Sequence, residues 1–199
     1  MTPIPIKSVD KSEQEQAIAA IVLAFAADPF SRWIFPDPHH YLKYFPQVVR
    51  FLCGNAFEHG TGYCIEGFAG SALWLPPDVH PREEELGEVL MHGVHEQRHE
   101  EVFTMLERMA SYHPTEPHWY LPMIGVQATH RGKGYGEALM EHALRPCDRE
   151  QKLVYLESTN PKNISLYQRY GFEILDTIQI GSSPPVSPML RRPQPRRLD

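Results

Sequence analysis

The spacing of hydrophobic residues divides the chain into alternating helix-like and strand-like segments. Five helices are predicted where apolar residues recur every three to four positions, over residues 17–25, 41–57, 83–112, 134–144 and 161–170. Six strands are predicted from shorter apolar runs, at residues 4–7, 63–65, 71–75, 118–126, 152–156 and 172–180. The second half therefore alternates strand, helix, strand, helix and strand. We expect a mixed α/β fold with a central twisted sheet flanked by helices.

Local signals mark several ends of these segments. Ser12 precedes two glutamates and the first apolar helix, and Asp28-Pro29 ends that helix. Asn160 is a good N-cap, and Pro161 is a favourable first helical residue. These signals support a helix that begins directly after the strand at residues 152–156.

The length and composition predict one ordinary globular domain. The chain has 199 residues, of which 42% are hydrophobic and 22% charged. We expect a single domain over residues 1–190, followed by a basic, proline-rich tail over residues 191–199. No apolar run approaches the roughly 18 residues that a membrane helix needs, so we expect no membrane partner. The three cysteines form no disulfide framework, which favours a cytoplasmic location.

Charge is distributed unevenly along the chain. The net charge is −6, and the last nine residues, RRPQPRRLD, contribute +3, so residues 1–190 carry −9. An acidic body binds nucleic acid poorly, because that affinity depends on neutralising phosphates. A cationic or amine-bearing partner is favoured instead. The tail is interpreted as a solvated end, with specific binding as the alternative.

The residues with the strongest chemical signal are 126–136, VQATHRGKGYG, between a predicted strand and a predicted helix. Glycines at 132, 134 and 136 allow a tight turn and a close approach of a ligand to the main chain. The start of the following helix presents free N–H groups to an anion. Because His130, Arg131 and Lys133 add positive charge, this segment predicts a phosphate site.

Two common phosphate motifs are excluded by single residues. A Walker A loop needs Ser or Thr after its lysine, but Gly134 follows Lys133. A dinucleotide GxGxxG fingerprint fails at Glu137 or at Leu139, depending on where it starts. The remaining pattern is Arg131-x-x-Gly134-x-Gly136. A plain glycine-rich turn is the alternative reading of this segment.

That pattern resembles the pyrophosphate loop of the GNAT superfamily of acyl-CoA-dependent N-acyltransferases. A second GNAT-like element follows it: Leu156-Glu157, then Asn160, Leu166-Tyr167 and Gly171-Phe172. Together the two motifs cover about residues 119–172. Residues 116–120, EPHWY, are also similar to the puromycin N-acetyltransferase branch, as are residues 24–28 and 72–77. The resemblance implies a GNAT-like mixed sheet and acetyl-CoA as acyl donor.

The resemblance also implies roles for individual residues. It makes Tyr167 the proton donor to the leaving thiolate and Glu157 the general base, with His118 and Glu116 as second choices for the base. The alternative roles are a core tyrosine for Tyr167 and a helix-capping carboxylate for Glu157. Cofactor contacts are implied for Ile124, Gly125, Val126, Arg131, Gly132, Lys133, Gly134, Tyr135, Gly136, Asn160, Asn163 and Tyr167.

The expected acceptor is a primary amine of a small molecule. The alternatives are an acyl-CoA-binding domain without activity and an acetyltransferase that acts on protein N-termini or lysines. A homodimer is left open.

We expect no metal: His92, His95 and His99 share one predicted helix face, but three ligands from a single helix seldom complete a zinc site. An aromatic group would line an acceptor pocket or belong to the core: Trp33, Phe35, Tyr41, Tyr44 and Phe45.

Overall fold

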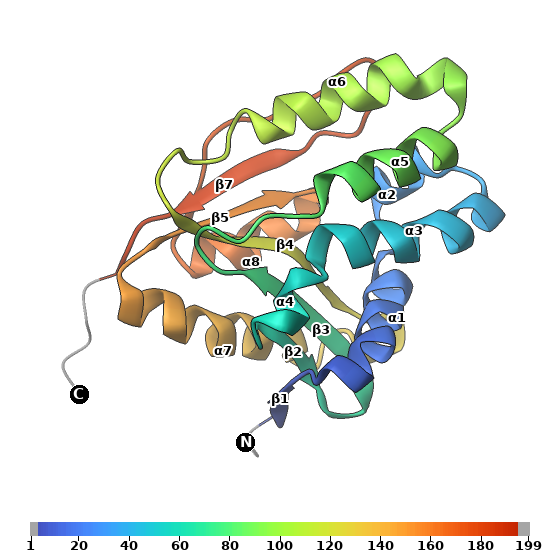
Figure 1. Cartoon of the computed structure of the whole chain (residues 1–199). Helices are drawn as coiled ribbons and strands as arrows, with labels where there is room; N and C mark the ends of the chain where they lie inside the picture. The colour runs from blue at the N-terminus through green and yellow to red at the C-terminus, as the bar shows by residue number, and fades with distance from the viewer. Residues whose placement is uncertain (1–3, 195–199) are drawn as a thin grey trace.

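A single mixed sheet forms the centre of the computed structural model, which describes residues 4–194 (Figure 1). The strand order is β1-β2-β3-β4-β5-β7-β6, and β4 and β5 are the only parallel neighbours among the described strands. The strands are β1 (Ile6–Ser8), β2 (Gly62–Ile65), β3 (Gly70–Leu75), β4 (His118–Val126), β5 (Leu153–Ser158), β6 (Phe172–Ile174) and β7 (Ser187–Arg191). The predicted mixed α/β fold is confirmed.

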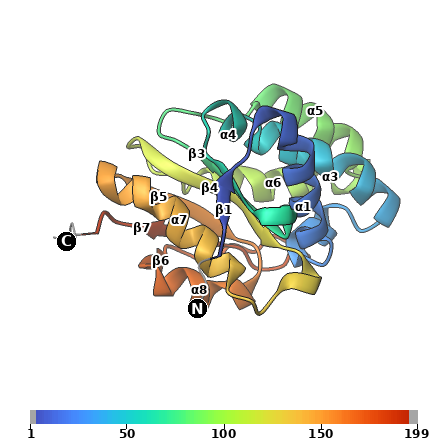
Figure 2. The ribbon, with the colours of Figure 1, turned by 90° about the horizontal axis from the view of Figure 1, so that it is seen from below.

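Helices cover both faces of this sheet (Figure 2). They are α1 (Gln14–Phe25), α2 (Pro29–Ile34), α3 (Pro38–Cys53), α4 (Asn55–Glu58), α5 (Glu83–Gly93), α6 (His99–Ala110), α7 (Tyr135–Glu150) and α8 (Ile164–Arg169). Alternate residues of β3 serve two cores: Leu73 and Leu75 pack with α1 and α3, whereas Ala72 and Trp74 pack with α7. Within residues 4–194, no helix has the length and hydrophobicity needed to cross a membrane.

The parallel strands β4 and β5 separate part-way along their length. They pair only from His118 with Leu153 to Tyr120 with Tyr155, although β4 continues to Val126. The register between β3 and β4 also shifts directly after Tyr120, where Pro122 contributes no N–H group. Beyond this point the β5-facing edge of β4 has no strand partner in the described part of the chain, so the sheet opens there.

The prediction of one helix over residues 83–112 is wrong. The structure has two helices, α5 and α6, separated by residues 94–98. Gly93 packs against the rings of Tyr44 and Phe35, and a Cβ there would lie 2.8 Å from Tyr44 Cγ. Val94 then turns to an extended conformation with its side chain buried. Tertiary packing therefore interrupts a helical pattern that the sequence continues.

Two further elements differ from the predictions. Asp28-Pro29 ends α1 as expected, but the same pair also begins α2, because the Asp28 carboxylate accepts a hydrogen bond from Ser31 N at 2.9 Å. The strand predicted at 172–180 ends at Ile174. Strand β7 was not predicted, because Pro184, Pro185 and Pro188 hide its pattern.

The expected tail begins inside the last strand. Arg191 is buried at the end of β7, where it pairs with Asp148 of α7 at 2.6 Å. Residues 195–199 of the expected tail lie outside the described residues.

Candidate active site

The glycine-rich loop forms one wall of a cleft at the open end of β4. Residues 128–130 make a short turn, and Gly132 and Gly134 then adopt left-handed conformations with φ of +76° and +77°. A residue with a Cβ is strained at such angles, so these two positions require glycine. Gly134 is also the N-cap of α7. The loop thus turns the chain from strand to helix with its main chain exposed.

Main-chain N–H groups of this loop have no acceptor in the described part of the chain. This holds for Gly132, Gly134 and Gly136, and α7 has no side-chain N-cap. A Cβ built at Gly132 would meet no atom within 4 Å. Free donors, open space and the positive end of a 16-residue helix together fit a diphosphate.

All the residues expected to contact the cofactor except Lys133 line this cleft of about 590 Å³. His130 also lines the cleft, and the structure adds two basic side chains, Lys162 and Arg169. Arg169 pairs with Glu137, which lines the same cleft. Arg131 has a second function, since its guanidinium donates to the carbonyl of Ala24 in α1 at 3.0 Å. Arg131 therefore fixes the loop against α1 as well as adding charge to the cleft.

Gly125 lines the cleft, and the packing of α1 explains why this position is a glycine. A Cβ at this position would lie 2.5 Å from the Cβ of Ala24 in α1. The missing side chain therefore lets α1 pack directly on β4. Ile124 and Val126, on either side of Gly125, also line the cleft.

The opposite wall of the cleft is the segment after β5. Asn160 caps this segment as predicted, accepting from Lys162 N at 3.1 Å. Asp28 holds the wall to the α1–α2 turn by accepting from the Thr159 hydroxyl at 2.9 Å. Asp28 was not among the predicted site residues, although it marked a helix boundary and belonged to the stretch 24–28 that resembles the puromycin branch. Its carboxylate fixes the separation of the two walls.

Tyr167 lies where the cleft meets a second space, a cavity of about 560 Å³. Four residues line both: Phe25, Ile124, Asn163 and Tyr167. Tyr167 is 6% exposed, and its hydroxyl has no hydrogen-bond partner within residues 4–194. Burial, together with the nearby Asp28 carboxylate, raises the pKa of Tyr167 far above its usual value. The hydroxyl therefore stays protonated at neutral pH.

Glu157 faces the cavity as part of a chain of polar groups. Its Oε1 lies 3.1 Å from Nε2 of His113, and Nδ1 of His113 lies 3.3 Å from Nε2 of His118. His118 Nδ1 is 2.8 Å from the carbonyl of Glu116, so it carries a hydrogen and donates there. The chain joins Glu157, from the end of β5, to His118, at the start of β4.

This arrangement accommodates a mobile proton. Burial, and then the charge of His113, lowers the pKa of His118, so its Nε2 is an acceptor at neutral pH. His113 donates from both nitrogens when it is protonated and Glu157 is ionised. If the proton moves to Glu157, the same contact persists with the carboxyl as donor. The Glu157 charge adds to burial in raising the pKa of Tyr120 and Tyr155, which keeps both phenols protonated.

Of the two second-choice bases, His118 belongs to the polar chain that includes Glu157. Glu116 contributes its main-chain carbonyl to this chain, not its carboxylate. His113, the central member, was not predicted. It follows a helix and precedes a proline, and no motif marks it. Only the fold brings it beside residues 118 and 157.

The remaining candidates separate into two groups. Phe35 and Phe45 line the cavity, while Trp33, Tyr41 and Tyr44 do not. Tyr41 donates to the carbonyl of Val22 at 2.7 Å.

The three histidines of the predicted helix lie on different segments: His92 contacts the Glu88 carbonyl, His95 stacks on His40, and His99 contacts the Val94 carbonyl. The described residues form no cluster of metal-binding side chains.

A comparison of the sequence with known families identifies this architecture. Residues 22–172 match the profile described as "Acetyltransferase (GNAT) family", which is most of the chain. The chain belongs to the GNAT family. It is therefore an N-acetyltransferase by family, and the family uses acetyl-CoA. The closer resemblance to the puromycin branch receives no such support.

Similar proteins agree with this family assignment. An "Uncharacterized N-acetyltransferase C550.08" of Schizosaccharomyces pombe is 24% identical over 94% of this chain and 83% of its own length. The solved structure of a "histone acetyltransferase HPA2 and related acetyltransferase" from Corynebacterium glutamicum has a TM-score of 0.68 at 24% identity, covering 99% of this chain and 100% of that one. The arylalkylamine N-acetyltransferase 2 of Aedes aegypti has a TM-score of 0.66 at 13% identity, covering 95% and 98%. These structures share the GNAT fold.

Proposed function

We propose that this GNAT protein transfers the acetyl group of acetyl-CoA directly to the primary amine of a small molecule. One observation carries the proposal: the cleft with the free loop amides and the cavity with the Glu157 carboxylate share Tyr167 as a lining residue. Two ligands that enter from the two sides meet at that residue. Such a meeting point is what direct transfer between bound substrates requires.

The residues of the cleft fit acetyl-CoA, which supplies an acetyl thioester. The free N–H groups at residues 132–136 bind a diphosphate, aided by the basic side chains around them. The unpaired edge of β4 at Ile124 and Val126 presents main-chain groups to the amide-containing arm of the donor. In this position the thioester end of the donor reaches the junction.

Tyr167 is the proton donor in this proposal. A departing thiolate, with a usual pKa of about 8.5, gains from a hydrogen-bond donor held in place. The Tyr167 hydroxyl is protonated at neutral pH, has no competing partner among the described residues and lies on the junction. It donates its proton to the leaving sulfur.

Glu157 is the base, and His113 and His118 carry the proton away. An alkyl amine with a pKa of about 10.4 is almost entirely protonated at pH 7, and deprotonating it costs about 4.6 kcal/mol. Glu157 accepts that proton inside the cavity. His113 passes a proton on to His118, which is partly exposed beside the loop at residues 114–117. The distances between the three side chains support this route.

The test of the proposed function is acceptor-dependent release of free CoA thiol, followed over a panel of primary amines. Thiol release that rises with amine concentration, together with an acetylated amine detected by mass spectrometry, is expected. An acyl-CoA-binding domain without activity would bind acetyl-CoA in calorimetry and release no amine-dependent thiol. A protein acetyltransferase would acetylate peptides and leave small amines untouched. Either result would contradict the proposal.

We also propose that the enzyme acts in the cytoplasm. All three cysteines are unpaired and buried, as expected in a reducing compartment. The homodimer stays a hypothesis, which analytical ultracentrifugation tests.

A further inference from the structure

The cavity beside Glu157 has walls that are mostly apolar. It lies between the sheet and the helices α2, α3, α5 and α6. Its apolar lining includes Phe30, Phe45, Leu86, Leu106, Met109 and Met123. A volume of about 560 Å³ is sufficient for a molecule with an aromatic ring or a medium-length alkyl chain. Ligand burial in such a space is driven by the hydrophobic effect.

The charged groups around this cavity are all of one sign, apart from its histidines. Neither lysine nor arginine is among its lining residues. Asp78, Glu83 and Glu116 line it with exposed side chains and form no ion pair within residues 4–194. The negative entrance attracts cations and repels anions.

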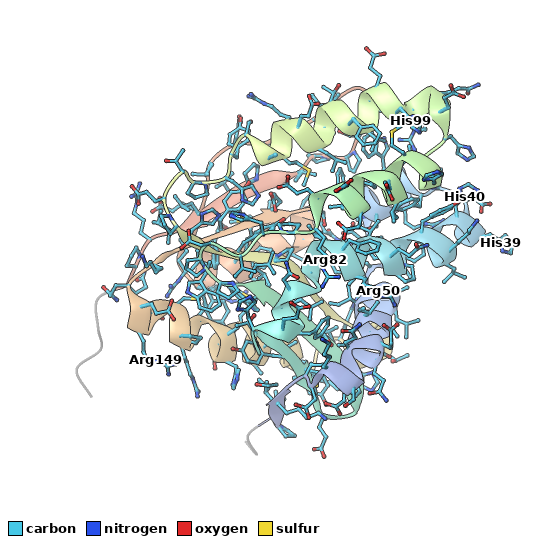
Figure 3. The ribbon with its side chains drawn as sticks, in the orientation of Figure 1. His39, His40, Arg50, Arg82, His99 and Arg149 are labelled. Atoms are coloured by element: carbon cyan, nitrogen blue, oxygen red, sulfur yellow. The ribbon has the colours of Figure 1, made fainter. Side chains whose placement is uncertain are left out.

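Two arginines close in sequence to this wall are paired with carboxylates that do not line the cavity. Arg82, next to the lining residue Glu83, pairs with Glu58 at 2.9 Å, and Arg50 of α3 pairs with Glu15 at 2.6 Å. Both arginines are labelled in Figure 3. Neither neutralises the carboxylates of the entrance. A ligand carboxylate that entered the cavity would find no lysine or arginine to pair with.

The interior offers a single carboxylate. Glu157 has a side chain that is 6% exposed, and the aliphatic and aromatic walls provide no second carboxylate at depth. A ligand therefore gains one charge-assisted contact inside. A second ammonium group held inside the cavity, away from the carboxylates of the entrance, would lie against apolar walls and lose its hydration without compensation.

From this combination we infer that the acceptor is a primary monoamine with a bulky apolar body and no carboxylate. The ammonium end lies at Glu157, near Tyr167, and the apolar body fills the space between the sheet and α3, α5 and α6. Amino acids and polyamines are poor acceptors. The inference rests on the proposed acetyl transfer and defines its substrate class.

The test compares matched acceptors under conditions of saturating acetyl-CoA. The kcat/KM for phenethylamine is expected to exceed that for phenylalanine by at least about 100-fold. Phenylalaninamide lacks the carboxylate charge, so its kcat/KM should approach that of phenethylamine. Across butylamine, hexylamine and octylamine, kcat/KM should rise about fourfold for each added methylene until the cavity is filled. 1,6-Diaminohexane should be a poorer acceptor than hexylamine.

Two variants test whether the cavity wall determines which amines are accepted. Leu86→Lys places a cation in the half-buried α5 wall and should lower kcat/KM for phenethylamine about tenfold or more, with unchanged affinity for acetyl-CoA. Leu42→Lys on α3, where the side chain is 63% exposed and outside the cavity, is the control and should change neither.

The outcomes separate this inference from the proposed function. Efficient acetylation of phenylalanine or 1,6-diaminohexane, or equal effects of the two variants, would overturn the substrate class and leave acetyl transfer standing. The absence of thiol release with every amine would contradict the proposed function itself.

Discussion

At the scale of single residues, the account depends on Tyr167 as proton donor. Replacing it by phenylalanine removes the hydroxyl and keeps the buried ring. We expect kcat to fall about 100-fold or more while the Kd for acetyl-CoA stays the same, because the hydroxyl acts on the leaving sulfur. Tyr170→Phe is the control, since that hydroxyl contacts α7 outside both spaces. Wild-type turnover in Tyr167→Phe would remove this residue from the mechanism.

Glu157 and His113 are tested by the basicity of the acceptor. Glu157→Gln should lower kcat/KM for an alkyl amine about 100-fold, and His113→Gln should lower it by a smaller factor, because both handle the proton of the ammonium. An acceptor of lower pKa needs less help from a base, so it should lose less activity in both variants. Glu107→Gln, on the exposed face of α6, is the control. A loss independent of acceptor pKa would indicate a structural role instead.

The same scale shows where sequence reasoning succeeds and where it stops. Asn160 and the glycines 132 and 134 have functions fixed by local backbone chemistry, so their motifs reveal them. His113 and Asp28 act through partners 44 and 131 residues away in sequence, and no local pattern records those distances. Gly125 matched a family position, but the reason for its glycine, the close approach of α1, appears only in the folded chain.

At the scale of elements, the proposed function assigns donor binding to the start of α7. Gly134→Val places a side chain beside the free N–H groups, at a residue with a φ of +77°. We therefore expect calorimetry to show that acetyl-CoA binding is lost. Gly60→Val is the control for backbone strain, because Gly60 has a φ of +66°, is exposed and lies outside the cleft. Both variants should lose about 1–3 kcal/mol of stability. Unchanged affinity in Gly134→Val would contradict the loop's function.

Element boundaries also show why part of the fold was missed. Periodicity located α7, β4 and β5, because each buries a regular stripe or run of apolar residues. It did not detect the break between α5 and α6, which depends on Gly93 packing against Phe35 and against Tyr44 of α3. It also missed strand β7, which its neighbours β5 and β6 stabilise despite its proline. In both places tertiary contacts override the local pattern.

At the scale of the whole molecule, an ion pair between the buried Arg191 and the partly exposed Asp148 joins strand β7 to α7. Arg191 donates to both oxygens of Asp148 in α7 and to the carbonyl of Tyr170 after α8. Arg191→Met removes the donor to these acceptors and should lower the free energy of unfolding by about 1–3 kcal/mol in urea titration. Arg192→Met, at an exposed neighbour, should change it by less than about 0.5 kcal/mol. Equal losses would contradict the anchoring function of Arg191.

The whole molecule also explains how one fold holds two substrates. The loss of pairing between β4 and β5 after Tyr120 opens the sheet, and helices on one face leave an apolar cavity beside that opening. In the function proposed above, the donor binds along the loop and the free edge of β4, and the acceptor enters from the acidic side. The two ligands need only meet at Tyr167 for transfer to occur.

A crystal structure of the protein soaked with CoA tests this central claim most directly. The account predicts a diphosphate bound by the main-chain N–H groups of residues 132–136, with the sulfur within hydrogen-bonding distance of the Tyr167 hydroxyl. Density that leaves the loop empty, or that places the sulfur away from the junction of cleft and cavity, would contradict it.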